Sequence, residues 1–157
     1  MTADIQIPIQ IYVDTDACPV KDEVARVAER HGLTVQFVAN AYMRLPQGPL
    51  MQRVMVAEGP DKADDWIAER AGPRDVVITG DVPLAARCVP KGASVLNHNG
   101  KPFTANNMGM TLASRNLMAH LRETGVAQTY NPSFSKADRS RFLQALEAAV
   151  QGIKRRG

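Results

Sequence analysis

Short β-branched runs alternate with stretches of helical periodicity along this chain, and this alternation limits the possible folds more than any other feature. Three runs are typical of buried strands, at residues 9–13, 34–39 and 76–79. Between them, apolar residues recur every three or four positions, as in amphipathic helices. Strands that alternate with helices form parallel sheets. The sequence therefore predicts an α/β fold, a three-layer sandwich with a mainly parallel central sheet of about four or five strands.

Helix start and stop signals divide the rest of the chain. Pro19 and Gly32 bound the first helical pattern, and Asp61 stands where it can cap the second. Ser135 and Asp138 resemble a capping box that opens the last helix. Helices are thus expected at residues 19–32, 61–71, 83–88, 107–123 and about 135–151, with short strands at 53–57 and 94–96. With 45% hydrophobic residues, a single domain over residues 1–157 is expected, with the C-terminal helix on its core.

Composition argues against several classes of protein. No apolar run approaches the roughly 20 residues of a membrane helix, so no membrane partner is expected. The first residues lack the basic start and apolar stretch of a secretion signal, and a cytoplasmic location is expected. Two cysteines, Cys18 and Cys88, suit a reduced compartment. From Arg115 onward there are eight basic and three acidic residues, which either attract a polyanion or form ordinary helix surface.

Aspartates stand where the chain is expected to leave or enter regular elements. Asp14 and Asp16 follow the first strand, Asp64 and Asp65 open a helix, and Asp81 follows the strand at 76–79. Because the carboxyl ends of adjacent parallel strands share one crevice, these carboxylates can converge there. Converging carboxylates repel one another unless a proton or a cation intervenes, and Mg²⁺ or Mn²⁺ prefer oxygen ligands. The pattern predicts a divalent-metal site, although any single Asp after a strand is also a common helix cap.

Longer motifs strengthen this interpretation. The chain carries, in order, the segments IYVDTDACP, VAN, EGPDKADDWI, DVVITGDVPLA, KGASVLNHNGKPFTANNM and SFSKADRSRF. Together they resemble the YaiI/YqxD family of small bacterial proteins, over roughly residues 11–146. That family is similar to the PIN/NYN-like nuclease superfamily, whose members carry a parallel sheet with acidic residues at its carboxyl edge. The resemblance implies a PIN-like domain in which Asp14, Asp81 and either Asp64 or Asp65 occupy the acidic positions.

The chemistry that suits such a site is hydrolysis of a phosphodiester. This reaction needs an activated water and relief of negative charge, which divalent ions held by carboxylates supply. We therefore expect a metal-dependent nuclease acting on RNA, with Asp14 and Asp81 both catalytic and metal-binding. Asp16 would orient a water, and Thr79, two residues before Asp81, would help to position it. Asn97 is a further candidate at the same edge, although Asn more commonly forms a turn.

Two other function classes remain open. The sequence DTDACP resembles the signature of haloacid dehalogenase-like phosphatases, in which Asp14 would be the nucleophile and Asp16 the acid/base. Those enzymes place a Lys and then an acidic pair late in the chain, whereas here the pair Asp64 and Asp65 comes early. The other alternative is a non-catalytic RNA-binding module, since a fold does not determine function. A pure binder has no need of carboxylates in a groove that repels phosphate, and this favours catalysis.

Overall fold

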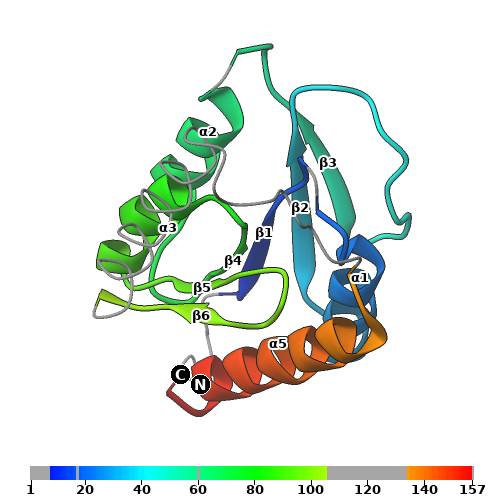
Figure 1. Ribbon diagram of the computed structural model, residues 1–157, viewed down its shortest axis with the longest axis vertical. Coiled ribbons are helices and arrows are strands. Elements are labelled where there is room, and N and C mark those ends of the chain that lie inside the picture. Colours follow the sequence, from blue (N-terminus) through cyan, green and yellow to red (C-terminus); the bar gives the residue numbers. More distant parts are fainter. Residues whose placement is uncertain (1–7, 17, 60, 106–133, 157) are drawn as a thin grey trace, which may run out of the picture.

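A six-stranded, mostly parallel sheet forms the centre of the molecule, as the computed structural model shows (Figure 1). The structure describes residues 8–16, 18–59, 61–105 and 134–156. The strands are β1 (Gln10–Asp14), β2 (Thr34–Ala39), β3 (Met51–Met55), β4 (Val76–Ile78), β5 (Ser94–Leu96) and β6 (Pro102–Phe103). The helices are α1 (Lys21–His31), α2 (Lys62–Arg70), α3 (Val82–Cys88), the 3₁₀ turn η1 (Val89–Lys91) and α5 (Lys136–Arg156). The sheet order is β3-β2-β1-β4-β5-β6, and only β6 runs antiparallel to its neighbour.

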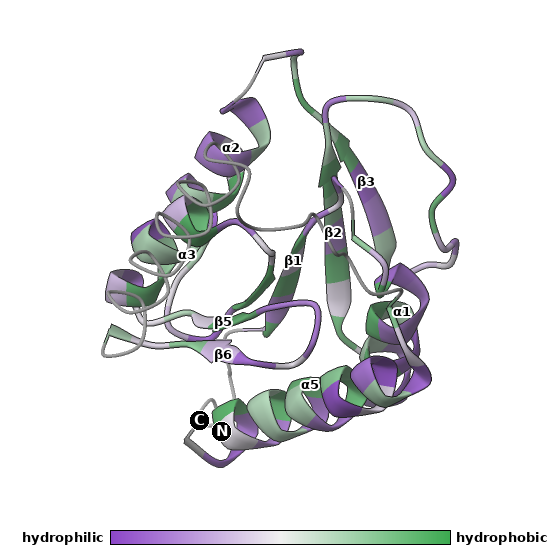
Figure 2. Cartoon of the chain, viewed as in Figure 1, coloured by the Kyte–Doolittle hydropathy of each residue, from purple (hydrophilic) through white to green (hydrophobic). Residues whose placement is uncertain are grey.

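Alternate residues of each central strand enter two separate cores, one on each face of the sheet. In β1, Ile11 and Val13 pack with α1 and α5, whereas Tyr12 packs with α2 and α3. Figure 1 shows these two helix pairs on opposite sides of the strands, and in Figure 2 the central strands are largely hydrophobic. A strand that is buried on both faces must be apolar throughout, which explains the continuous β-branched runs. The predicted α/β three-layer sandwich is confirmed.

Several element boundaries differ from the sequence-based expectations. The strand expected at 53–57 begins two residues earlier, at Met51, and the last helix continues to Arg156. Strand β6 was not expected, because it has only two residues and begins with a proline. The reciprocal Ser135–Asp138 capping box is confirmed: each backbone N–H bonds to the other side chain at 3.0 Å. The helix expected at 107–123 lies outside the described residues.

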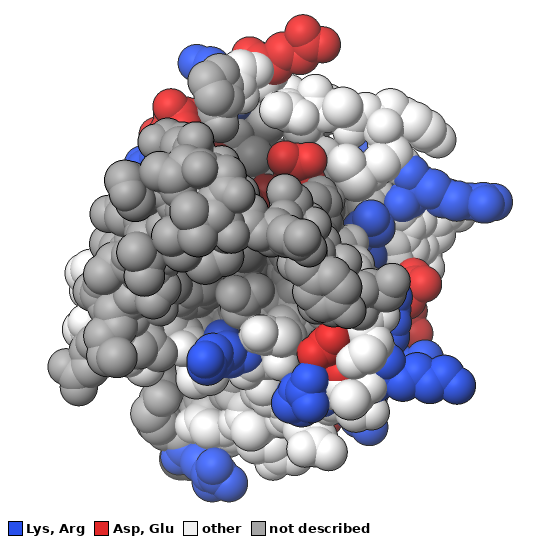
Figure 3. Space-filling view, viewed as in Figure 1, with Lys and Arg blue, Asp and Glu red and all other residues white. Residues whose placement is uncertain are grey.

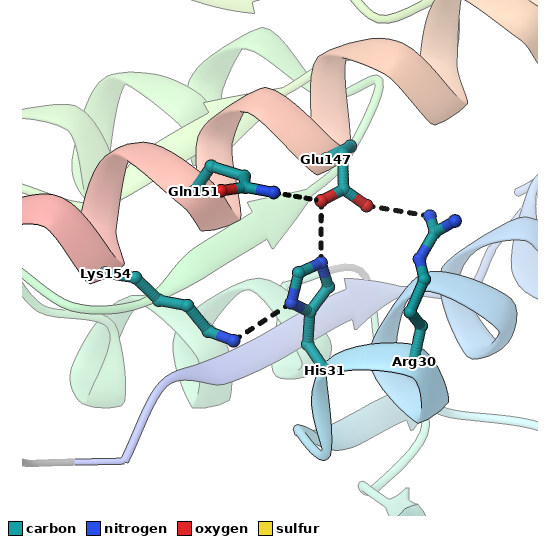
Figure 4. Close-up of polar contacts among 5 residues, drawn as sticks. All are labelled: Arg30, His31, Glu147, Gln151 and Lys154. Carbon is teal, nitrogen blue, oxygen red and sulfur yellow. Dashed lines mark hydrogen bonds and ion pairs between the residues drawn. The ribbon is translucent and has the colours of Figure 1, made fainter.

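Polar contacts join α5 to α1 at the edge of the core that these two helices form with the sheet. Glu147 accepts hydrogen bonds at 2.7 Å from Arg30 and His31 and at 2.8 Å from Gln151, while Lys154 lies 2.9 Å from the other ring nitrogen of His31 (Figure 4). The hydrogen bond from Gln151 lowers the pKa of Glu147 most, burial opposes this effect, and the bond from His31 and the charge of Arg30 lower the pKa further. These contacts hold α5 against α1, and the apolar residues Phe142, Leu146, Val150 and Ile153 of α5 join the core beneath.

Basic side chains gather near α5 and α1. In Figure 3 Lys and Arg side chains of the visible face lie over the region of these helices and at the right edge, with some acidic side chains among them and others toward α2. Part of this basic charge is engaged within the molecule: Arg139 bonds to Glu23, and Arg141 to Asp138. Within the described residues, no helix combines the length and apolar character needed to cross a membrane.

Candidate functional site

The strand order creates a crevice between β1 and β4. From β1 the chain proceeds to β2 on one side, whereas β4 leads to β5 on the other. Neighbouring parallel strands that diverge in this way leave a gap above their carboxyl ends, where ligands of α/β proteins bind. Asp14 ends β1, and Thr79, Gly80 and Asp81 follow β4 directly. The topology therefore brings two of the three aspartate segments to the switch point.

A small cleft of about 80 Å³ lies at this edge and collects four carboxylates. Its lining consists of Asp14, Asp16, Val38, Ala39, Asn40, Met43, Ala63, Asp64 and Asp81. The convergence that the sequence suggested is thus present for Asp14, Asp16, Asp64 and Asp81. Thr79 lies beside the cleft, fully buried, and Asp65 is not part of the lining.

A hydrogen-bond chain joins the two strand ends. The Thr79 hydroxyl donates to Asp14 Oδ2 at 3.0 Å and accepts from the backbone N–H of Asp81 at 3.0 Å. Asp81 Oδ1 accepts from the N–H of Leu84 at 3.3 Å and so caps α3. Thr79 was expected to position a water, but its proton is engaged with Asp14. In the structure, Thr79 therefore contacts the carboxylate of Asp14 and fixes its orientation.

The turn after β1 separates Asp14 from Asp16 by one inward-pointing residue. Thr15 is buried, and both its backbone N–H and its hydroxyl donate to the carbonyl oxygen of Val38, at 3.1 and 2.5 Å. This double contact extends the β1–β2 pairing by one residue beyond Asp14. Asp14 is consequently half-buried in the crevice, whereas Asp16 is exposed at its rim.

Adjacent aspartates on α2 have different surroundings. Asp64 lines the cleft, whereas Asp65 pairs with Arg87 at 2.8 Å. Asp64 is three and four residues before the buried Ile67 and Ala68, so it shares their face of the helix. This spacing was readable in the sequence, although the choice between the two residues was left open. Asp61 occupies the expected N-cap position, but its side chain makes no capping hydrogen bond.

Crowding and burial disfavour negative charge in the cleft. Burial raises the pKa of Asp14, the charges of Asp81 and Asp16 add to the rise, and the bond from Thr79 opposes it. Burial, followed by the charges of Asp81 and Asp14, raises the pKa of Asp64 to about 6. Two carboxylates thus hold protons more tightly than usual, and a cation in the cleft would relieve this repulsion.

Asp64→Asn should stabilise the metal-free protein near neutral pH. Because the folded-state pKa of Asp64 is raised from 3.8 to about 6, its ionised form opposes folding. This unfavourable contribution is absent below about pH 4, grows as the pH rises toward 6 and is complete above that value. Thermal unfolding in EDTA should therefore show a higher Tm for the variant than for wild type at about pH 7, and a smaller difference at about pH 4.

Asp65→Asn is the matched control for that experiment. It removes the same charge from the same helical turn, so both variants lose a similar interaction with the helix N-terminus. Asp65 lies outside the cleft and is paired with Arg87, so this variant should be neutral or slightly destabilised. The same Tm change in both variants would contradict the assigned crowding at Asp64.

Other polar residues near the strand ends fall into two groups. Asn40 follows β2 and lines the cleft, although it was not proposed as a site residue. Its position at the end of a strand next to β1 could have identified it. Asn97 is turn-forming: its side-chain oxygen accepts from the N–H of His98 at 2.6 Å, and it does not line the cleft.

The thiol of Cys18 is buried, which raises its pKa to about 11, so it is a poor nucleophile.

Comparison with known proteins identifies relatives over nearly the whole chain. A UPF0178 protein of Parvibaculum lavamentivorans is 63% identical over 147 residues, covering 94% of this chain and 97% of the relative. UPF0178 proteins of Nitrobacter winogradskyi and Gluconobacter oxydans are 58% and 57% identical, each over 94% of this chain and over 94% and 84% of their own lengths. No solved structure matches the chain. A family model described as "Uncharacterized BCR, YaiI/YqxD family" matches residues 12–152. The chain therefore belongs to the YaiI/YqxD family of bacterial proteins.

Proposed function

We propose that this protein is a divalent-metal-dependent nuclease that acts on RNA with Mg²⁺ or Mn²⁺. The observation that carries the proposal is the convergence of Asp14, Asp16, Asp64 and Asp81 in one cleft at the switch point of the sheet. These residues come from three separate segments of the chain. Helix capping accounts for Asp81 alone, since it is the only one of the four for which a capping hydrogen bond is described.

The arrangement of the carboxylates suits a hydrated ion. Among the described residues, no group of three or more His, Cys, Asp or Glu side chains is positioned to hold an ion directly. Mg²⁺ commonly keeps several of its waters and binds through one or two carboxylates together with substrate phosphates. Asp14, Asp64 and Asp81 are the residues that would hold it, directly or through waters. Burial, and after it the charges of neighbouring aspartates, raises the pKa values of Asp14 and Asp64, and a bound cation would favour the ionised form of both.

Each residue around the cleft has a defined part in this proposal. When bound, the ion would neutralise phosphate charge and lower the pKa of a water. Thr79 is a positioning residue, because its hydroxyl donates to one oxygen of Asp14 and so fixes the orientation of that carboxylate. Asp16, exposed at the rim, orients the attacking water and accepts its proton. The amide of Asn40 supplies a neutral donor for a phosphate oxygen in an otherwise anionic cleft.

RNA is the substrate class expected from the likeness to PIN/NYN-like nucleases, and the expected cytoplasmic location belongs to the same proposal.

A phosphatase of the haloacid dehalogenase type is less well supported. Such an enzyme needs a lysine beside its nucleophile, but no lysine is among the residues described around the cleft. Lys91, a candidate for that role, instead donates a hydrogen bond to the carbonyl oxygen of Ala68.

The proposal predicts that purified protein cleaves single-stranded RNA when Mn²⁺ or Mg²⁺ is present and is inactive in EDTA. Gel analysis of end-labelled RNA measures cleavage, and restoring Mn²⁺ after EDTA should restore it. Hydrolysis of p-nitrophenyl phosphate under the same conditions, without RNA cleavage, would identify a phosphatase. RNA binding that is independent of metal, without cleavage of varied RNAs and DNAs, would identify a binding module.

A further inference from the structure

Two large apolar side chains are strongly exposed in the described part of the chain, and both lie beside Arg53. Tyr42 is 81% exposed and Met55 is 51% exposed. The guanidinium carbon of Arg53 lies 4.7 Å from the centre of the Tyr42 ring, within the range of a cation–π contact. Arg53 and Met55 are two residues apart on β3, so their side chains leave the same face of the sheet. Tyr42, Arg53 and Met55 together form a surface that we call the edge platform.

Positive charge on the edge platform, and at Arg44 in the same loop as Tyr42, is not neutralised locally. Arg44 and Arg53 are both exposed, and among the described residues neither forms an ion pair with a carboxylate. Strand β3 is the outermost strand on its side of the sheet. Because Tyr42 is 81% exposed, burial in the core does not explain its presence. Its ring is held by Arg53 with most of its surface open to solvent.

Chain connections place the edge platform next to the acidic cleft. Asn40 and Met43 line the cleft, and Tyr42 lies between them in the same loop. Met55 pairs in register with Ala39, which also lines the cleft. A second hollow of about 290 Å³ lies on the other side, between residues 45–48 and Met51, Gln52 and Arg53. The surface thus runs from the carboxylates across Tyr42 and Arg53 into this hollow.

We infer that the edge platform binds single-stranded RNA, with a base stacked on Tyr42 and a neighbouring phosphate contacting Arg53 or Arg44. This inference rests on the proposed nuclease function and names the surface that would select unpaired RNA. Aromatic rings and guanidinium planes stack on bases of any sequence, but only on bases that are free of a duplex. The cation–π contact orders the ring in advance, which lowers the entropy lost when a base stacks on it. The arginines offset the repulsion between the RNA and the nearby carboxylates.

The test measures RNA binding separately from cleavage. A fluorescein-labelled single-stranded RNA of about ten nucleotides is titrated with protein in EDTA, and anisotropy gives Kd. Tyr42→Ala should weaken binding about tenfold, the effect of losing one base–aromatic stack, and Tyr42→Phe should retain it. Arg53→Gln should weaken binding and reduce its salt dependence. RNA annealed to its complement should bind no better to wild type than to Tyr42→Ala.

Arg70→Gln is the matched control. Arg70 also lies over an aromatic ring, 4.0 Å from the centre of Trp66, but Trp66 packs on the opposite face of the sheet. This variant removes the same charge and the same type of contact, and its RNA affinity should equal that of wild type.

The outcomes separate this inference from the proposed catalysis. Unchanged RNA affinity in Tyr42→Ala would reject RNA binding by the edge platform, even when Mn²⁺-dependent cleavage is observed. The absence of RNA binding by the wild-type protein would reject it as well. Loss of binding in Tyr42→Ala without any cleavage by wild type supports the platform and rejects the nuclease. A homodimer that Tyr42→Ala dissociates, with RNA affinity unchanged, would instead assign this surface to a second copy of the chain.

Discussion

Asp81→Asn should abolish metal-dependent RNA cleavage while preserving the fold. Asp81 Oδ1 accepts a hydrogen bond from the Leu84 N–H, and an Asn side-chain oxygen can accept the same bond, so the cap of α3 survives. The amide lacks the negative charge that makes a carboxylate a good ligand for a hard cation. Initial rates of RNA cleavage in Mn²⁺ should fall by more than about 100-fold, with a circular dichroism spectrum and Tm close to those of wild type.

Asp65→Asn again supplies the control, now for activity. It removes a carboxylate close in sequence to Asp64 but outside the cleft, so cleavage should continue at about the wild-type rate. Equal losses of activity in the two variants would point to a general electrostatic effect. Cleavage by Asp81→Asn at the wild-type rate would show that the activity belongs to another site or to a contaminant.

Gly100→Ala should be strongly destabilising, since the turn between β5 and β6 touches the backbone of α5. A Cβ at this position would lie 2.6 Å from the Arg141 carbonyl oxygen and 3.1 Å from the Phe142 Cα. Gly100 also has φ of 88°, which disfavours any side chain. Relief of the clash requires α5 to move, and with it the fully buried Phe142. Urea unfolding should show a loss of about 3 kcal/mol or more.

Gly32→Ala isolates the backbone part of that effect. Gly32 ends α1 with φ of 69°, but nothing lies within 4 Å of a Cβ built there. The expected loss is about 1–2 kcal/mol, from the left-handed conformation alone. If both variants lose the same stability, close packing between the β5–β6 turn and α5 does not contribute.

Local signals in the sequence determined much of the fold. The strands Thr34–Ala39 and Ser94–Leu96 match the expected residues, because short runs rich in β-branched and other apolar residues are bounded there by turn residues. Gly32 ends α1 and Ser135 opens α5, since both signals act through atoms within a few residues. The acidic strand ends were visible for the same reason, and a parallel sheet requires that such ends share one edge. Even the difference between Asp64 and Asp65 follows from helical spacing to Ile67 and Ala68.

Only the tertiary structure decided which residues meet across the chain. Strand order cannot be read from separate runs, yet it places Thr79 against Asp14, 65 positions earlier, a contact that the sequence did not predict. Strand β6 exists because it pairs with β5, and its two residues carry no signal of their own. The exposure of Tyr42 beside Arg53 likewise depends on β3 lying at the edge of the sheet. Capping and periodicity act over a few residues, whereas contacts between distant elements depend on how whole elements pack, which no local pattern in one sequence contains.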